Sequence, residues 1–189
     1  MNNTFKTILF SVLLATVTTL CKFLFGPVPA FSGFSPVIAI ALFSGYTIRQ
    51  KEWVFFFSLT ALFVSDLFIE LLHQNGLFDY AGIYAGQWKN YLLLLSSTWI
   101  GFMLRGRSYK GIFTGAFAGA TLFFLLSNGL VWYQTSEVVY AKTWAGLTTC
   151  YVAGLPFYRN SLLSTLVFLP GILLVYNYLL LGKKALKLA

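Results

Sequence analysis

The chain has 189 residues, of which 58% are hydrophobic and only 10% are charged, and its formal net charge is +8. This composition is far too apolar for an ordinary soluble domain, so it favours one integral membrane domain over residues 1–189. The 13 basic residues are scattered, mostly where apolar stretches end, and form no basic stripe, which argues against nucleic-acid binding.

Six apolar stretches are candidates for transmembrane helices, because a helix needs about 20 mostly apolar residues to cross the hydrocarbon core. The predicted spans cover residues 5–25, 35–49, 53–73, 88–105, 110–132 and 161–181. The second is short and starts at Ser35 and Pro36, where serine supplies a cap and proline suits the first helical turn. We therefore predict an all-α integral membrane protein with six transmembrane helices.

The basic residues divide unevenly between the two ends of these spans. Nine fall on the side of the chain termini: Lys6, Arg49, Lys51, Arg105, Arg107, Lys110, Lys183, Lys184 and Lys187. Four fall on the opposite side: Lys22, Lys89, Lys142 and Arg159. By the positive-inside rule, both termini are expected in the cytoplasm of a protein that crosses the cell's inner membrane several times. In a rival interpretation the first span is a signal peptide cleaved after "VPA", before Phe31.

The longer connections lie on the outer side, which is where recognition is expected. The last of them, from Tyr133 to Asn160, contains a predicted amphipathic segment over residues 138–158. Its face is formed by residues at steps of three and four: Tyr140, Trp144, Leu147, Tyr151 and Leu155. Two roles stay open for this segment, either lying in the membrane interface or covering a binding pocket.

Small residues at four-residue steps indicate close helix contacts on two spans. On the fifth span they are Gly111, Gly115 and Gly119, and we expect that bare face to pack within the bundle. The first span has a weaker stripe, formed by Ser11, Ala15 and Thr19.

The stretch "SDLFIELLHQNGLFD", residues 65–79, holds three of the five acidic residues and the single histidine. On a helix, Asp66, Glu70 and His73 share one face. An ionisable side chain inside a span costs about 2.5–3.5 kcal/mol at mid-bilayer, so this face is expected to look into the bundle and to have a partner. By helical rise, Lys22 of the first span reaches the same depth, and we predict that it pairs with Asp66 or Glu70.

Asn128 of the fifth span lies at the same predicted depth, so polar groups from three helices are expected to share one layer near the outer side. Together with aromatic residues of the outer connections, this layer forms a candidate solute pocket. Its predicted lining residues are Asp66, Glu70, Asn128, Trp132, Lys22, Trp144, Tyr151 and Phe157. The alternative is a buried ion pair that only fixes the register of the helices.

Neither a metal site nor an enzyme is predicted. Asp66 and His73 are about 10 Å apart along a straight helix, too far to hold one ion together with Glu70, and the chain has no second histidine. It also has no HExxH, GxSxG or P-loop motif. No cofactor is expected, and Cys21 and Cys150 are interpreted as apolar packing residues.

Four stretches, "SPVIAIALFSG", "VSDLF", "SNGLVW" and "GLTTCYVAGLPFYRN", resemble a family of uncharacterised bacterial membrane proteins, a domain of unknown function. The resemblance runs from about Phe31 to Phe168. The matching positions are Pro36, Ala39, Phe43, Gly45, Ser65, Asp66, Asn128, Trp132, Gly146, Leu147, Pro156, Phe157 and Asn160. Six spans with both ends inside and long outer connections over a polar layer also resemble the substrate-binding S-component of energy-coupling factor (ECF) importers.

The S-component resemblance implies a bundle of that type, which captures a vitamin-like micronutrient on the extracytoplasmic side without catalysis. It also implies partners besides membrane lipid, namely a transmembrane coupling subunit and ATPases, with docking at Ser11, Ala15 and Thr19. The amino-terminal Met-His motif of metal-specific relatives is absent, so nickel and cobalt are not implied. Two other functions stay open: a structural or assembly membrane protein, and a small ion-coupled carrier.

Overall fold

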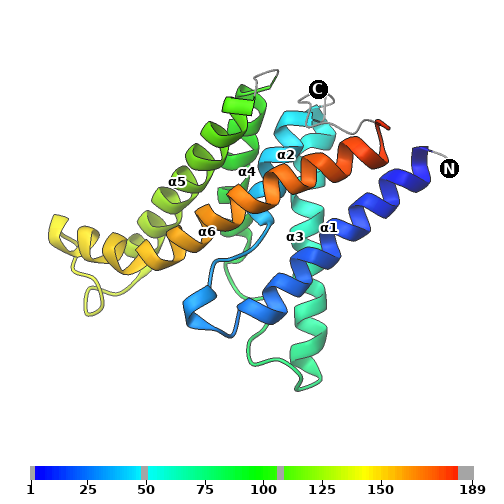
Figure 1. Ribbon diagram of the computed structural model, residues 1–189. Coiled ribbons are helices and arrows are strands. Elements are labelled where there is room, and N and C mark those ends of the chain that lie inside the picture. Colours follow the sequence, from blue (N-terminus) through cyan, green and yellow to red (C-terminus); the bar gives the residue numbers. More distant parts are fainter. Residues whose placement is uncertain (1–2, 48–50, 106–108, 183–189) are drawn as a thin grey trace.

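The computed structural model describes residues 3–47, 51–105 and 109–182, and its regular structure within these ranges is entirely helical (Figure 1). Its helices are α1 (Asn3–Phe25), α2 (Val37–Thr47), α3 (Lys51–Gln74), α4 (Trp88–Met103), α5 (Tyr109–Gln134) and α6 (Trp144–Leu179), with a 3₁₀ turn, η1 (Pro29–Phe31), before α2. The first five α-helices match the first five predicted spans within a few residues. Five residues of the charge count lie outside the described residues: Arg49, Arg107, Lys183, Lys184 and Lys187.

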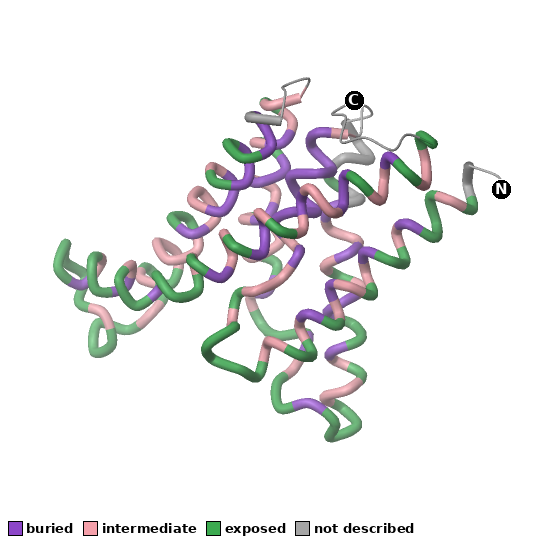
Figure 2. Tube along the Cα trace, viewed as in Figure 1, coloured by how far each residue is buried: buried purple, intermediate pink, exposed green. Residues whose placement is uncertain are grey.

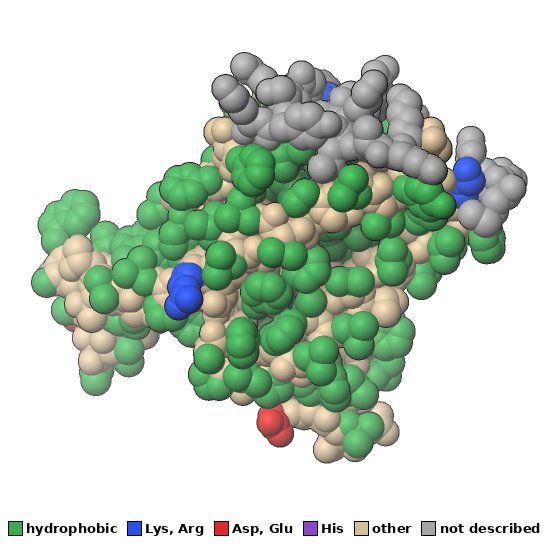
Figure 3. Space-filling model, viewed as in Figure 1, with side chains coloured by type: hydrophobic (Ala, Val, Ile, Leu, Met, Phe, Trp, Pro, Cys, Tyr) green, Lys and Arg blue, Asp and Glu red, His purple; other side chains and the backbone are tan. Residues whose placement is uncertain are grey.

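Three of the described helices are long and apolar enough to cross a membrane, over Phe5–Phe25, Gly111–Gln134 and Trp144–Leu179. Hydrophobic side chains cover most of the face seen in Figure 3, with few charged groups among them. These features indicate a membrane protein. The helix α2 has only 11 residues, about 17 Å of helix, which is shorter than the roughly 30 Å of a hydrocarbon core.

The last third of the chain differs from the sequence prediction. The sequence predicts a separate amphipathic segment and a sixth span, whereas the structure has one continuous helix of 36 residues, α6. It starts directly after Thr143, whose side chain accepts a hydrogen bond from the Gly146 amide at 3.2 Å. Pro156 and Pro170 lie inside α6. Each proline removes one backbone donor, but breaking the helix in an apolar environment would leave more backbone groups unpaired.

The core surrounds α2, which packs most extensively against α4 and also contacts α3, α5 and α6. Every residue of α2 from Ile38 to Tyr46 is buried, as expected for a helix that is apolar on all sides (Figure 2). Gly45 of α2 and Gly101 of α4 make this contact possible. A Cβ atom at Gly45 would overlap the backbone oxygen of Thr98, and one at Gly101 would overlap that of Leu42. The two helices therefore touch backbone to backbone.

The glycine stripe of α5 also faces α2. A Cβ atom at Gly115 would overlap the Tyr46 hydroxyl, and one at Gly119 would lie about 3.0 Å from the Leu42 side chain. The same hydroxyl of Tyr46 donates a hydrogen bond of 2.8 Å to the backbone oxygen of Gly111. The three small residues thus bring α5 onto the central helix, and α5 then packs along α4 and α6.

Candidate functional site

Asp66 is a buried acid on α3, only 6% exposed, and its carboxylate has three side-chain partners from other elements. Lys22 of α1 forms an ion pair with Oδ1. Gln87, just before α4, and Tyr91, on α4, donate hydrogen bonds to Oδ2 at 2.5 and 2.6 Å. These donors offset the cost of burying a charge. We call Lys22, Asp66, Gln87 and Tyr91 the Asp66 cluster; it joins α1 and α4 to α3.

The other two ionisable residues of this helix face hold the following loop rather than Lys22. Glu70 accepts hydrogen bonds from the backbone amide of Ile83 at 3.0 Å and from the Gln74 side chain at 2.9 Å. His73 Nδ1 lies 2.9 Å from the backbone oxygen of Phe78. Lys22 therefore pairs with Asp66, one of the two partners predicted for it. Among the described residues, no group of three His, Cys, Asp or Glu side chains is placed to hold a metal ion.

The loop of residues 75–87 lies tightly against α1 and α3. At Gly82 the loop runs so close to α3 that a Cβ atom would overlap the backbone oxygen of Asp66. The Phe78 ring stacks on Phe23 of α1, with ring centres 5.6 Å apart, and the Tyr80 hydroxyl lies 3.4 Å from the backbone oxygen of Lys22. Burial raises the pKa of Tyr80, and the nearby Asp66 charge raises it further, so this phenol stays protonated.

A hollow of about 340 Å³ opens between this loop, the start of α4 and the end of α5, and we call it the α4–α5 hollow. Its polar wall consists of Tyr84, Lys89, Asn90, Ser127, Gln134 and Thr135, and Leu130 and Val131 supply apolar surface. Asn90 donates a hydrogen bond of 2.5 Å to the Tyr84 hydroxyl, and Lys89 Nζ donates one of 2.7 Å to Gln134. Hydrogen bonds among these side chains thus hold the polar wall in place.

Tyr84 connects this hollow to the Asp66 cluster. Its backbone amide donates to Gln87 Oε1 at 3.3 Å, while Gln87 Nε2 donates to Asp66. Burial raises the pKa of Tyr84, the hydrogen bond from Asn90 lowers it, and the Asp66 charge raises it again. The net increase keeps the phenol neutral, so it can act as a hydrogen-bonding group in the wall of the hollow.

A second hollow, of about 330 Å³, lies between α5 and the first half of α6, and we call it the α5–α6 hollow. Its lining includes Asn128 and Phe157, two residues of the predicted pocket. Gly154 lets α6 approach closely here, because a Cβ atom at this position would overlap the Asn128 side chain. Ser127 and Val131 line both hollows, so the two adjoin at α5.

The predicted single pocket is therefore divided. Lys22, Asp66 and Glu70 lie on α1 and α3, whereas the five other predicted lining residues lie on α5 and α6, toward the opposite side of Figure 1. The division has a physical reason: the Asn128 side chain lies against Gly154 of α6 instead of pointing toward α3, and its amide donates to the backbone oxygen of Phe124, one turn earlier on α5. In the described structure, none of the eight predicted residues lines the α4–α5 hollow.

The remaining aromatic residues of the prediction have separate positions. Tyr151 donates a hydrogen bond of 2.9 Å to the backbone oxygen of Leu125, and Trp132 Nε1 donates one of 3.0 Å to that of Ala141. Trp144 is 82% exposed at the start of α6. Of the predicted aromatic face, Tyr151 thus attaches α6 to α5, whereas Trp144 is largely exposed.

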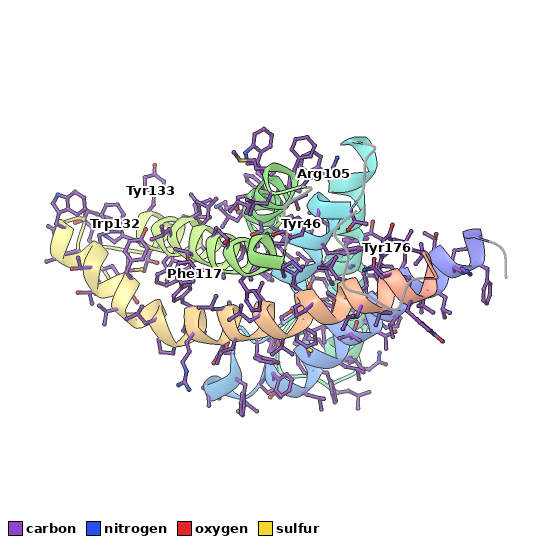
Figure 4. All side chains as sticks on the ribbon, turned by 45° about the horizontal axis from the view of Figure 1, so that its top comes forward. Tyr46, Arg105, Phe117, Trp132, Tyr133 and Tyr176 are labelled. Atoms are coloured by element: carbon purple, nitrogen blue, oxygen red, sulfur yellow. The ribbon has the colours of Figure 1, made fainter. Side chains whose placement is uncertain are left out.

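Lys142 caps the carboxyl end of α5. Its ammonium donates hydrogen bonds to the backbone oxygens of Trp132, Tyr133 (3.1 Å) and Thr135 (2.6 Å), and lies 5.3 Å from the centre of the Trp132 ring. Figure 4 shows Trp132 and Tyr133 at this end of α5, with Tyr133 pointing away from the bundle. A cation at this position satisfies free carbonyls and opposes the negative end of the helix dipole.

The comparison with family models matches residues 1–188 to a family of unknown function, DUF6580. The chain belongs to that family. The predicted membership in an uncharacterised family is thus confirmed, and it extends beyond the range of the motifs that suggested it. Searches of curated proteins and of solved structures gave no match. Since the DUF6580 description contains no activity, any statement about function depends on the site.

The sequence alone did not predict several polar residues of the site in this DUF6580 chain. Gln87 and Tyr91 complete the Asp66 cluster, and Tyr84, Lys89 and Asn90 line the α4–α5 hollow. All of them lie in the stretch "YAGQWKNY", at the start of the fourth span. The signal that could have identified them is the high density of side-chain hydrogen-bond donors in this stretch. Without the path of the loop, such a stretch cannot be distinguished from an ordinary helix end that faces solvent.

Proposed function

We propose that the chain is a solute-binding membrane component of a micronutrient importer, which takes up a small vitamin-like solute on the extracytoplasmic side of the inner membrane. The observation that carries this proposal is the α4–α5 hollow. Small-ligand sites are concave, combine apolar surface with a few placed polar groups, and have volumes of about 300–1,000 Å³. The hollow has these properties and lies at the small end of that range.

The proposed orientation has six membrane-embedded helices with both termini in the cytoplasm, and the short α2 crosses only part of the hydrocarbon core. In Figure 1, the starts of α1, α3 and α5 and the ends of α2, α4 and α6 lie toward the same side of the molecule. The Asp66 cluster and the α4–α5 hollow lie toward the other ends of these helices. Since most basic residues are expected on the side of the membrane where the chain termini lie, the positive-inside rule supports an outward-facing hollow.

Solute entry would involve the 75–87 loop, which forms one wall of the hollow. The contacts of this loop with Glu70, Phe23 and Lys22 hold it closed against α1 and α3. In an ECF-like system the energy for release would come from a coupling subunit and ATPases. For docking, α1 offers Ser11, Ala15 and Thr19: all three are half-buried, and the two hydroxyls are bonded to backbone oxygens of α1 itself.

Native mass spectrometry of the protein, purified gently from a native membrane, tests the proposal. A retained small molecule, with co-purification of a transmembrane subunit and ATPases, is the expected result. Asn90→Ala and Gln134→Ala should lose the molecule, because both amides line the hollow. Asn75→Ala is the matched control, since this exposed amide lies outside the hollow. An empty wild-type protein that no added solute stabilises would contradict the proposal.

A structural role is the second candidate, and the saturation of Asp66 favours it. Both carboxylate oxygens already have partners inside the protein, namely Lys22, Gln87 and Tyr91. The cluster therefore suits a lock between helices better than an ion-coupling site, and it disfavours a carrier that works through Asp66. If Asp66→Asn changes only the melting temperature while all hollow variants behave like wild type, the structural role is the better description.

A further inference from the structure

We infer that the α4–α5 hollow takes a small monoanion, a carboxylate on a compact and partly apolar frame. This inference rests on the proposed solute-binding function and adds the chemical class of the solute. It follows from three observations: the partners of Lys89, the balance of the helix ends around the hollow, and the neutral character of the remaining walls.

Lys89 is half-buried and brings a positive charge to the wall of the hollow. Within the described part of the chain, its recorded partners are neutral: the Gln134 amide at 2.7 Å and the Trp88 ring, whose centre is 5.9 Å away. Two acids of α3 are engaged elsewhere, Asp66 with Lys22 and Glu70 with the 75–87 loop. Asp79, the acid nearest to Lys89 in the sequence, is exposed and is not among the residues that line the hollow. An ammonium in the wall of a hollow with neutral partners favours an anionic ligand, because charge-assisted hydrogen bonds are the stronger ones.

The helix ends around the hollow add to this positive potential. The amino end of α4, which carries a partial positive charge, begins at Trp88, directly beside Lys89. The carboxyl end of α5 also reaches the hollow and would carry a partial negative charge. That negative end is offset by the Lys142 ammonium, which donates to three of the last carbonyls of α5 and its following turn. Of the two helix ends, the positive end of α4 therefore contributes more, and Glu137, an exposed acid after α5, is not among the lining residues.

The other walls define the rest of the solute. Their hydrogen-bonding groups are neutral amides, hydroxyls and the Tyr84 phenol, and Leu130 and Val131 offer apolar contact. The hollow has one lysine and no arginine among its lining residues, so it balances one negative charge. A dianionic phosphate is usually held by an arginine or by several cations, which disfavours it here.

Matched pairs of ligands test the inference on the full-length protein in detergent or nanodiscs. We would measure binding of benzoate against benzamide, nicotinate against nicotinamide, and indole-3-acetate against indole-3-acetamide by calorimetry and thermal shift. At least one carboxylate should bind the wild type about tenfold more tightly than its amide. Lys89→Gln should abolish that preference, and Lys89→Arg should retain it. Arg159→Gln, which removes an exposed cation outside the hollow, is the control and should leave the preference unchanged.

The outcomes separate the inference from the proposed function. If amides bind as tightly as carboxylates, or if the preference survives in Lys89→Gln, the anion class is wrong while solute binding stands. If Lys89→Gln fails to fold, the wild-type carboxylate-to-amide ratio still decides. If no pair binds, the charge of the molecule retained in native mass spectrometry decides: an anion supports the inference and a neutral or cationic molecule overturns it. An empty protein overturns both proposals.

Discussion

The ion pair between Lys22 and Asp66 should be a major source of stability, and Asp66→Asn is the sharpest way to test it. The change keeps the shape of the side chain but leaves the Lys22 ammonium beside a neutral amide. The side chains of the pair are 19% and 8% exposed, so both charges are largely withdrawn from water. Removing one partner of a buried pair costs about 3–5 kcal/mol. Since Lys22 keeps some exposure, we expect a loss of about 3 kcal/mol in the free energy of unfolding.

A double-mutant cycle measures the pairing itself. Lys22→Met, Asp66→Asn and the double variant would be unfolded chemically in micelles, with helicity as the readout. Because the double variant contains no unpaired charge, it should be more stable than the sum of the single losses predicts, by about 1–3 kcal/mol. Single losses below about 0.5 kcal/mol that simply add would refute the reasoning, because exposed ion pairs behave in that way.

Three further predictions follow from the packing and the loops. Gly45→Ala should destabilise the protein by about 1–3 kcal/mol, because the new methyl group meets the α4 backbone, and thermal unfolding would show this loss. Gly171→Ala is the control: its methyl group would meet nothing within 4 Å, so the melting temperature should stay unchanged or rise. Lys142→Met should speed amide hydrogen exchange in the connection after α5, since the carbonyls that the ammonium holds lose their donor. Unchanged exchange would show that the cap is dispensable. Because the folded-state pKa of Tyr84 is raised, its contribution to stability is present below the unfolded value of about 10 and is lost as pH rises through the folded value. Tyr84→Phe should therefore reduce the alkaline loss of stability, and an identical alkaline melting profile would count against this explanation.

Local sequence signals predicted the helices and some of their contacts. Apolar runs placed the first five helices, because the breaks between them contain proline, glycine and charged residues. Four-residue spacing of Gly115 and Gly119 indicated a close helix contact, although it did not identify α2 as the neighbour. Since helical rise is a fixed quantity, depth along two helices predicted that Lys22 pairs with Asp66 or Glu70, and the structure has the pair with Asp66.

The rest of the site depends on the path of a loop and on the approach of one helix to another, and neither produces a periodic pattern in the sequence. Gln87 and Tyr91 reach Asp66 only because the loop of residues 75–87 folds back over α3, where Gly82 permits contact with the backbone. The direction of Asn128 depends in the same way on Gly154, which lies on another helix. The predicted break between the segment ending at residue 158 and the span starting at 161 was wrong, because apolar surroundings favour an unbroken helix over local propensity.

The basic residues expected on the outer side connect these observations. Lys22 has an anionic partner in Asp66, and Lys142 binds the negative end of α5. Lys89 differs from both, because in the described structure its recorded partners are an amide and an aromatic ring. The first two lysines are thus explained by the fold that they stabilise, independently of any ligand. Lys89 is the lysine of these three whose charge the fold does not balance, and it lies in the wall of a hollow of ligand size.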